Sequence, residues 1–337
     1  MRKILFVFLA LNCALASVVS CAKKSPTGPA AQDIPDPRQW YQLAGTARWT
    51  PRMSHASTVF GAQLWTLGGA QTNITPGPTY NDVWHSADGN DWTQATASAQ
   101  WSPRYGHAAV AFAGKLWLLG GHTADHDTND VWNSTDGADW QQVTPAAAWP
   151  GRSNFVALVF RDSLWVIGGN RLTGTVYGDV WRSGDGINWQ QVTAAMPWAA
   201  RCYHAGLVHA DRMWILGGGA NAKASIALDD VWSSADGSAW RQVAPHAPWG
   251  VRWGHSAVSY DGKIWLAAGD DSIHCGLDSI TRQHDLWCSS DGAQWQLADT
   301  AAPWTGRWGQ SAAVMGQSLY IMGGYSGAVN DEVWVWR

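Results

Sequence analysis

Residues 101–140, WSPRYGHAAVAFAGKLWLLGGHTADHDTNDVWNSTDGADW, contain the repeating unit from which the fold can be deduced. Short apolar runs alternate with turns rich in Gly, Asp and Ser, and no run has the spacing of an amphipathic helix. Each run has the length of one β-strand, and four of them fit between the first and the last Trp. The stretch therefore predicts a small sheet of four antiparallel strands.

The unit occurs six times along the chain. Its first element, Trp-x-x-Arg, returns at intervals of 52, 48, 49, 51 and 55 residues. Every copy continues with an apolar run, a Gly-Gly pair or close equivalent and an Asp-Val-Trp type strand, and five copies end in Asp-Gly-x-x-Trp. The copies begin at Trp49, Trp101, Trp149, Trp198, Trp249 and Trp304. Four strands in each unit of ~50 residues are the signature of a propeller blade, so the sequence predicts an all-β, six-bladed β-propeller.

The two ends of the chain are expected to close the ring. The sixth copy stops at Arg337 without its fourth strand, whereas Asp36 to Trp40 repeat the Asp-x-x-x-Trp spacing. Trp40 precedes Trp49 by nine positions, the distance found in every later connection between blades. The N-terminal strand should therefore complete the sixth blade and cover two open sheet edges. Residues 36–337 would form one closed domain.

The Gly-Gly pair, the downstream aromatic residue and the closing Trp resemble the kelch repeat of galactose oxidase-like propellers over residues 36–337. The third strand differs, since it has Trp where kelch repeats more often have Tyr. The resemblance implies a six-bladed propeller, and some periplasmic kelch propellers are sugar mutarotases. Residues 201–204, Arg-Cys-Tyr-His, also resemble part of the copper site of the kelch radical oxidases. Those enzymes take a second copper His from a following domain, which this sequence lacks, so no copper or other cofactor is expected.

The N-terminus is similar to that of a bacterial lipoprotein. Residues 1–20 hold two basic residues, an apolar run of signal-peptide length and small residues directly before Cys21. Cys21 would carry the lipid and anchor the protein to a membrane surface without a spanning helix. Residues 21–35 comprise this Cys and a flexible tether rich in Pro and Ala. In the sorting rule that the resemblance implies, Ala22 favours the outer membrane, on its periplasmic or surface face; an ordinary secretory signal is the alternative.

Composition excludes several classes of protein. The 337 residues include 26 Trp, too high an aromatic content for a disordered chain. The net charge is −4, and removal of residues 1–20 takes away two basic residues and leaves −6. No basic stripe is present, so nucleic acid is not expected as a partner. Cys202, Cys275 and Cys288 allow one disulfide, either Cys275–Cys288 or Cys202–Cys275. We expect a monomer.

Residues that recur in every blade are expected to have a structural role within the blade. The Arg of each copy should bond main-chain carbonyls or the acidic residue of the neighbouring strand, and His follows that Arg by three positions in four blades. Because Phe155 and Gln310 fill this position elsewhere, packed and hydrogen-bonded histidines are favoured over a metal ring. The three columns are Arg52, Arg104, Arg152, Arg201, Arg252 and Arg307; Asp82, Asp130, Asp179, Asp230, Asp285 and Glu332; and His55, His107, His204 and His255. The Ser-x-Asp-Gly turns resemble a shortened Asp-box of sialidases, which is structural and implies no glycosidase activity.

Spacing confines the variation between blades to one rim. The first Trp and the second-strand aromatic residue are 16 positions apart in all six copies, whereas the loop between strands two and three has 11, 7, 8, 10, 14 and 6 residues. That loop and the connection into strand one lie on the same rim of an up-and-down blade, where binding is usually found. Possible metal ligands in the loops of blades two and five, such as His122 and Asp127 or Asp270 and His274, are interpreted as solvated polar groups, and no metal is assigned.

Three Trp lie outside the repeating columns. Trp336 is the second-last residue of the sequence and is expected to be structural, whereas Trp253 and Trp308 directly follow the Arg of their blades. Flat aromatic faces cover the C–H faces of sugars, and protein partners also favour exposed Trp, Tyr and Arg. The predicted ligand-binding residues are Trp253, Trp308, Tyr105, Tyr325, Asn170, Arg171, Asn221, Asp270 and Asp271.

These features predict a lipid-anchored binding module of the cell envelope that recognises carbohydrate or an envelope protein on the variable rim. The rival hypothesis is a sugar mutarotase or epimerase, in which Asp270 or Asp271 with His274 or Arg171 would supply an acid and a base. A third is a scaffold for an envelope complex. No catalytic residue is assigned, because no spacing demands one.

Overall fold

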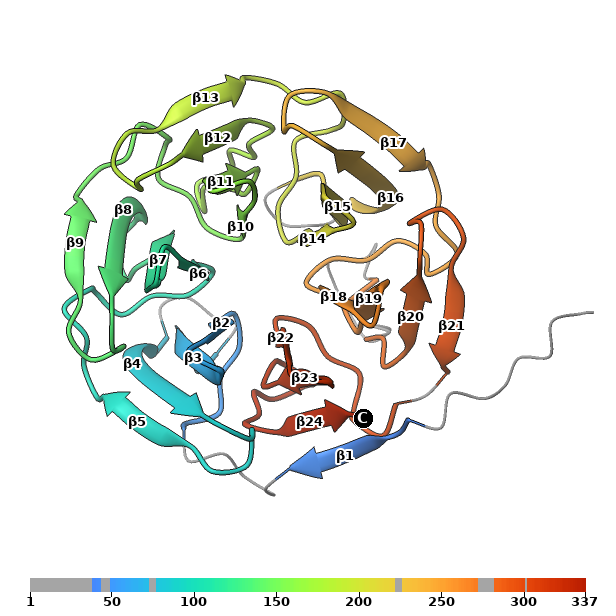
Figure 1. Cartoon of the computed structure of the whole chain (residues 1–337), viewed down its shortest axis with the longest axis horizontal. Helices are drawn as coiled ribbons and strands as arrows, with labels where there is room; N and C mark the ends of the chain where they lie inside the picture. The colour runs from blue at the N-terminus through green and yellow to red at the C-terminus, as the bar shows by residue number, and fades with distance from the viewer. Residues whose placement is uncertain (1–37, 44–48, 73–76, 222–225, 272–281, 301) are drawn as a thin grey trace, which may run out of the picture. The chain divides into compact units, whose positions relative to one another are not determined.

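The computed structural model describes residues 38–43, 49–72, 77–221, 226–271, 282–300 and 302–337. These residues form six four-stranded antiparallel sheets arranged as blades around a central channel (Figure 1). They contain no α-helix, and accordingly no helix long and apolar enough to cross a membrane. The predicted all-β, six-bladed propeller is confirmed. The signal peptide, Cys21 and the tether lie outside the described residues.

Strand bounds follow the sequence repeats in all six blades. Blade one comprises β2 (Ala56–Phe60), β3 (Gln63–Ala70), β4 (Thr79–Ser86) and β5 (Thr93–Thr96); blade two β6 (Ala108–Phe112), β7 (Lys115–His122), β8 (Asp127–Ser134) and β9 (Gln141–Thr144); blade three β10 (Val156–Val159), β11 (Leu164–Ile167), β12 (Val180–Ser183) and β13 (Gln190–Thr193). Blade four comprises β14 (Ala205–His209), β15 (Arg212–Gly219), β16 (Ala227–Ser234) and β17 (Trp240–Ala244); blade five β18 (Ser256–Tyr260), β19 (Lys263–Ala267), β20 (Leu286–Ser289) and β21 (Gln296–Asp299); blade six β22 (Ser311–Met315), β23 (Ser318–Met322), β24 (Val333–Trp336) and β1 (Trp40–Leu43).

The ring is closed by its N-terminal strand, as predicted. β1 pairs antiparallel with β24, with Trp40 opposite Trp336 and Leu43 opposite Val333. The Trp40 ring lies 4.1 Å from that of Trp304 and 5.2 Å from that of Trp336 between ring centroids. Both ends of the described domain are therefore in one sheet, and Trp336 is structural, as expected.

Each blade contains the buried ion pair that the sequence predicts. In blade three, Arg152 donates to both carboxylate oxygens of Asp179 at 2.7 and 2.9 Å and to the carbonyl of Gly168 at 2.8 Å. The same Asp179 also accepts the indole N–H of Trp181 at 2.7 Å. The five equivalent pairs are Arg52–Asp82, Arg104–Asp130, Arg201–Asp230, Arg252–Asp285 and Arg307–Glu332. The structural interpretation of the Arg and Asp columns is confirmed.

Two circles of backbone hydrogen bonds join the blades, a feature that sequence reasoning missed. In the inner circle, each residue two positions after the Arg donates its N–H to the carbonyl of its counterpart in the preceding blade, over 2.7–3.0 Å. In the outer circle, the second Gly of each pair donates to the Arg carbonyl of the next blade, over 2.8–2.9 Å. The inner circle comprises Ser54, Gly106, Asn154, Tyr203, Gly254 and Gly309, all with positive φ.

The second-strand aromatic residues pack between blades, which explains why the Asp-Gly turns do not vary. A Cβ on Gly137, in the turn of blade two, would lie 2.1 Å from the Trp65 ring of blade one. The turn itself is held by Ser134, whose hydroxyl accepts the N–H of Gly137 at 2.8 Å and donates to Asp136 at 3.0 Å. This rim is therefore fixed by packing.

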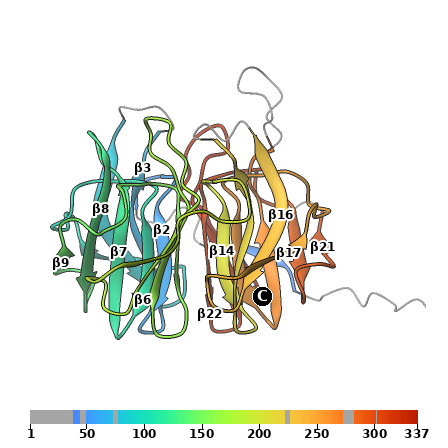
Figure 2. The same cartoon turned by 90° about the horizontal axis from the view of Figure 1, so that it is seen from above.

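The opposite rim carries the connections that enter each first strand and the loops between second and third strands (Figure 2). Their proximity is direct, because Met53, which follows the first Arg, forms a β-bridge with Ala70 at the start of such a loop. The predicted shared rim is confirmed.

We predict that Asp179→Asn lowers the free energy of unfolding by about 3–5 kcal/mol, because it leaves the Arg152 guanidinium buried without its full charge partner. The side chain of Arg152 is 0% exposed and that of Asp179 is 9% exposed. Urea unfolding followed by circular dichroism measures the effect.

The matched control is Asp211→Asn, which removes the ion pair of Arg161 and Asp211 on the surface, where the side chains are 54% and 73% exposed. We expect an unchanged urea midpoint, since exposed pairs contribute little. Equal losses in the two variants would contradict a special role for the buried pair.

Candidate functional site

Twelve residues in six antiparallel bridges lie at the mouth of the channel on the variable rim. Eight of them are buried, and four are half-buried, namely Tyr105, Trp253, Trp308 and Tyr325. In each blade, the residue after the Arg pairs with the residue after the Gly-Gly element. The pairs are Met53–Ala70, Tyr105–His122, Ser153–Asn170, Cys202–Gly219, Trp253–Asp270 and Trp308–Tyr325. No two blades share a pair, although the Arg and Gly positions beside them repeat. We call these twelve residues the mouth ring.

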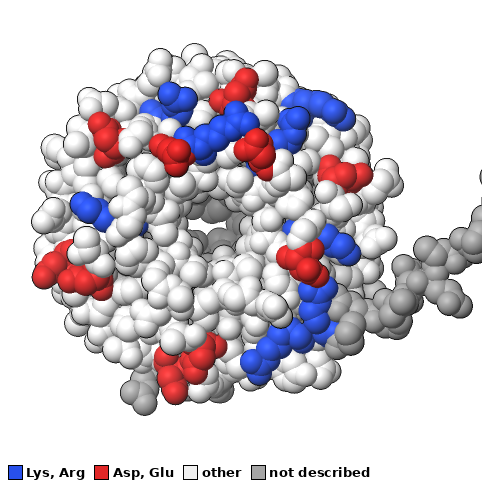
Figure 3. Space-filling model, viewed as in Figure 1, with Lys and Arg blue, Asp and Glu red and all other residues white. Residues whose placement is uncertain are grey.

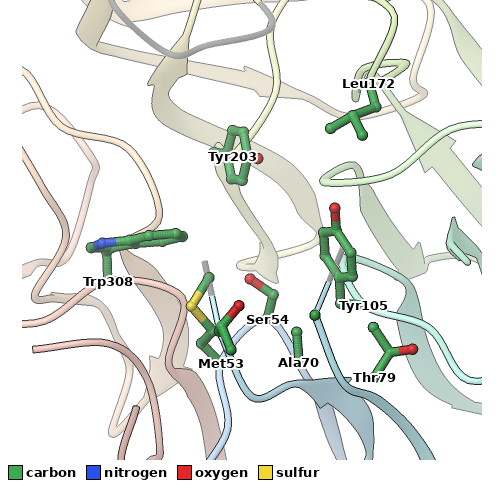
Figure 4. A pocket seen from close by; sticks show the side chains of 10 residues that line it. Met53, Ser54, Ala70, Thr79, Tyr105, Leu172, Tyr203 and Trp308 are labelled. Carbon is green, nitrogen blue, oxygen red and sulfur yellow. The ribbon is translucent and has the colours of Figure 1, made fainter. Parts of the chain in front are cut away.

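A cavity of about 110 Å³ opens at this mouth. Figure 4 shows Trp308 and Tyr105 on different sides of it, with Tyr203 between them and Leu172 above Tyr105. Among the described residues, its lining contains no charged side chain. The lining residues are Met53, Ser54, Ala70, Thr72, Gly77, Thr79, Tyr105, Leu172, Tyr203 and Trp308. The cavity therefore offers aromatic and aliphatic surface together with a few hydroxyl groups.

A row of aromatic rings extends from this cavity along blades four, five and six. Tyr203 packs edge-on against Trp253 with ring centroids 5.3 Å apart, Trp253 lies 4.8 Å from Trp308, and Trp308 lies 5.8 Å from Tyr325. All four side chains are half-buried, so each presents part of its surface. Sequence reasoning did not assign Tyr203 to the site, although it is the one bulky residue of the inner circle and has a φ of 54°. The signal available in the sequence was this column, which holds Gly, Ser or Asn in the other five blades and a bulky aromatic residue in blade four.

The structure brings together some of the nine predicted residues and separates others. Trp308 and Tyr105 line the cavity, and Trp253 and Tyr325 join it through the aromatic row. Asn170 and Asp270 belong to the mouth ring but are 0% and 2% exposed, beneath the surface.

The remaining three lie away from the lining of this cavity. Arg171 is exposed beside Leu172. The carbonyl of Asn221 accepts the thiol of Cys202 at 3.3 Å, and Asp271 accepts the side-chain amide of Gln283 at 2.9 Å.

Behind the cavity, a polar cluster connects blades two and three. Asp127 accepts from the ring of His122 at 3.1 Å and from the hydroxyl of Ser153 at 2.8 Å, both on Oδ1, while Oδ2 accepts the Leu172 N–H at 2.8 Å. Burial raises the pKa of Asp127, but the hydrogen bonds from His122, Leu172 and Ser153 outweigh it and hold the pKa below its usual value. The His122 ring meets the Tyr105 ring edge-on at 5.2 Å.

The channel continues below the mouth with an uncharged wall. Its lower part is a cavity of about 390 Å³ lined by the innermost strands of five blades, mainly by Val and Ala. Figure 3 shows the channel as a central hollow, with Lys, Arg, Asp and Glu spread over the ring around it. The channel therefore accommodates uncharged ligand groups more readily than charged ones.

The histidine column lies in the seams between blades. Burial and the nearby Arg201 lower the pKa of His204 to about 3, and His55, His107 and His255 behave alike. The rings pack against neighbouring blades, and His55 also bonds to the hydroxyl of Ser311 at 2.8 Å. Among the described residues, no group of three or more His, Cys, Asp or Glu side chains could hold a metal ion.

The cysteines are placed only in part. Cys202 is a buried free thiol that donates to the carbonyl of Asn221, so the Cys202–Cys275 pairing is wrong. Burial raises the pKa of this thiol to about 12. Cys288 is buried in β20, whereas Cys275 and the other blade-five candidates His274 and Asp278 lie outside the described residues.

We predict that His204→Phe makes the protein less sensitive to acid. The pKa of this His is 6.5 in the unfolded chain and about 3 in the folded protein, so below pH 6.5 the proton binds the unfolded state first. The free energy of unfolding therefore falls as the pH drops below about 6.5. Between pH 7 and pH 5, one such residue accounts for about 2 kcal/mol. The variant is expected to fold because Phe155 occupies the same position in blade three, 6.0 Å from the Trp149 ring.

Urea midpoints of the parent and His204→Phe at pH 7 and pH 5 test this. The parent should lose more stability than the variant between the two pH values. An identical loss in both proteins would show that His204 is accessible to protons in the folded state.

Comparisons with known proteins agree with this architecture. The family model described as the KLHDC2/KLHL20/DRC7 Kelch-repeats domain matches residues 54–269. The tRNA wybutosine-synthesizing protein 2/3/4 of Oryza sativa subsp. japonica is 33% identical over 86 residues, which are 25% of this chain and 8% of that protein. The chain thus corresponds to a small part of that relative's length. The structure of YjhT is similar with a TM-score of 0.69 and 17% identity, over 86% of this chain and 95% of the other, a likeness of fold.

Proposed function

This chain belongs to the KLHDC2/KLHL20/DRC7 Kelch-repeats domain family, and on that premise we propose that it is a binding module whose ligand occupies the mouth of the channel. The observation that carries the proposal is the cavity of about 110 Å³ at the mouth ring, lined by Tyr105, Tyr203 and Trp308. Repeated positions maintain the blades, whereas the mouth ring differs in every blade. Variation on a fixed scaffold is the pattern expected of a recognition surface.

Carbohydrate is the ligand class that this lining favours. The aromatic faces of Trp308 and Tyr105 suit the C–H faces of a sugar ring, and the hydroxyls of Ser54, Thr72 and Thr79 suit its hydroxyl groups. The described lining contains no charged group that would demand an ionic partner. An envelope protein that inserts an aromatic or aliphatic side chain is the alternative ligand.

A sugar mutarotase or epimerase is the second candidate function, and the pair of His122 and Asp127 favours it. The carboxylate accepts the Nδ1 proton of the ring at 3.1 Å, which leaves Nε2 as the basic nitrogen. The ring packs against Tyr105, which lines the cavity. Neither residue is among those named from sequence for acid–base catalysis. Accelerated exchange between the anomers of a bound sugar, measured by NMR, would favour the enzyme over the binding module.

A scaffold for an envelope complex is the third candidate. A scaffold would be expected to present a flat aromatic rim. The mouth is concave, which favours a module that encloses part of its ligand.

We predict that Trp308→Ala abolishes glycan binding while the fold is retained. The side chain is half-buried at the cavity and belongs to none of the repeating Trp columns. Its loss removes contact area at the mouth, including the ring contacts to Trp253 and Tyr325, and leaves the buried Trp columns between the blades in place. A glycan array probed with residues 22–337 measures binding, and near-UV circular dichroism verifies the fold. Hot-spot aromatic residues typically contribute at least ~2 kcal/mol, which is a loss of about thirtyfold.

The matched control is Tyr41→Ala, an aromatic residue of β1 that is 41% exposed on the outer strand of blade six. It should bind as the parent does. If Trp308→Ala still binds glycan, the ligand binds elsewhere on the protein. If the parent binds no glycan, an envelope protein becomes the proposed ligand.

We further propose that Cys21 is lipidated and anchors the protein in the bacterial cell envelope, in the outer membrane. The supporting observation is the sequence alone, namely the apolar run of residues 1–20 followed by small residues and Cys21. The tether of residues 21–35 would connect the anchor to the propeller.

We predict that Cys21→Ser abolishes incorporation of an alkyne-labelled fatty acid and releases the protein from the membrane fraction. Anchoring requires acyl chains that insert into the bilayer, and serine does not receive them in this reaction. Gel fluorescence after click labelling, together with fractionation, measures both effects. Cys13→Ser is the control and should label like the parent; labelling that persists in Cys21→Ser would refute the assignment.

A further inference from the structure

The carboxylate of Asp127 lies at the junction of blades two and three and receives three hydrogen bonds from the described residues around it. His122 donates from β7, Ser153 from the connection into β10, and Leu172 from the loop after β11. The side chain of Asp127 is 3% exposed, so the group is enclosed by these partners. The contact with Leu172 joins residues 45 positions apart in two blades.

The three partners all donate hydrogen bonds in this arrangement, and a carboxylate accepts all of them on its two oxygens. An Asn can donate to the Ser153 hydroxyl and to the other tautomer of the His122 ring while its oxygen still accepts the Leu172 N–H. An Ala, in contrast, removes the acceptor of all three groups. The blades do not need this group, since blades two and three already contain their own ion pairs, Arg104–Asp130 and Arg152–Asp179.

What Asp127 fixes is the position of Leu172. The loop that carries it is closed by bonds from the Arg171 N–H to the Thr175 carbonyl at 2.7 Å and from the Gly174 N–H to the Arg171 carbonyl at 2.9 Å. The Leu172 side chain is 45% exposed, although it lines the cavity at the mouth (Figure 4). A large aliphatic side chain kept partly in water at a cavity is poised for contact with a ligand.

Leu172 gives the cavity an aliphatic patch beside its aromatic walls, across the cavity from Met53 and Ala70 (Figure 4). Aromatic faces bind the C–H faces of any sugar, whereas an aliphatic patch contributes to affinity only where the ligand has an apolar substituent to bury. A methyl group is the common substituent of that kind on a sugar ring, as in N-acetylated and 6-deoxy sugars.

We propose that Asp127 is a positioning residue that holds Leu172 at the channel mouth, and that the aliphatic patch so completed selects a sugar carrying a methyl group. This inference rests on the proposed function in carbohydrate binding. It adds to that function the class of sugar that is bound. It also extends the site to the junction of blades two and three, where Asp127 acts on the ligand only through Leu172.

The test uses an array on which glucose, galactose and mannose are each present in unmodified, 6-deoxy and 2-acetamido forms, probed with residues 22–337. The parent should prefer methyl-bearing forms by about fourfold to tenfold, the range expected for one buried methyl group. Leu172→Ala and Asp127→Ala should both lose this preference. A parent without preference, or an Asp127→Ala variant that keeps it, would overturn the proposal.

The matched control is Asp229→Ala, which breaks the other described pair of Asp with His. His246 bonds Asp229 at 3.1 Å there, but its side chain is 83% exposed. This variant should keep both binding and preference. If it loses the preference as Asp127→Ala does, the effect reflects general destabilisation and the proposal fails.

Hydrogen exchange of the Leu172 amide, followed by NMR, separates this inference from the proposed function. The amide should be protected in the parent and in Asp229→Ala and should exchange at least about tenfold faster in Asp127→Ala, because its acceptor is lost. If no sugar binds but this pattern holds, carbohydrate binding and the sugar class are refuted while the positioning role stands. An unprotected Leu172 amide in the parent overturns the positioning role whatever the array shows.

Discussion

A buried arginine in each blade is the element on which the rest of the structure depends. Its guanidinium joins the connection before the first strand to the Gly carbonyl after the second strand and to the carboxylate before the third-strand Trp. Its own main-chain carbonyl accepts the N–H of a Gly in the preceding blade. One residue thus fixes a blade internally and attaches it to its neighbour, and six of them define the ring. Because a buried guanidinium without a carboxylate is very unfavourable, Arg and its acidic partner recur together.

The fold could be predicted because its constraints repeat. Any residue that the ring needs is needed six times, so the Arg, Gly-Gly and Trp columns stand out in a single sequence. The position of β1 was predictable for the same reason, since Trp40 keeps the spacing of the other fourth-strand Trp. The inner circle of hydrogen bonds was not predictable, because it is made by backbone groups and its members share no side chain, only a positive φ.

The residues of the candidate site could be predicted only where they differ from the repeating sequence pattern. Trp308 and Tyr105 were found because they are aromatic residues outside the repeating columns, and both line the cavity. Asn170 and Asp270 were chosen as polar groups of the same rim, but both are buried beneath its surface. Tyr203 and Leu172 were missed, since their positions depend on contacts between blades. The hydrogen bond from Leu172 to Asp127 joins two blades, and no local sequence pattern predicts it.

The pairing of β1 with β24 also sets an order of events during synthesis. Trp40 and Trp336 are direct partners although 296 positions separate them in the chain. The first strand to leave the ribosome is therefore the last to find its partner, and at about 5–20 residues per second it waits for many seconds with an exposed edge. Five blades can form from contiguous sequence during that interval, whereas the ring gains its final cooperativity only when the last residues emerge. A chain truncated by even its last strand would leave two unpaired edges, which would make an incomplete product easy for proteases to distinguish from a finished one.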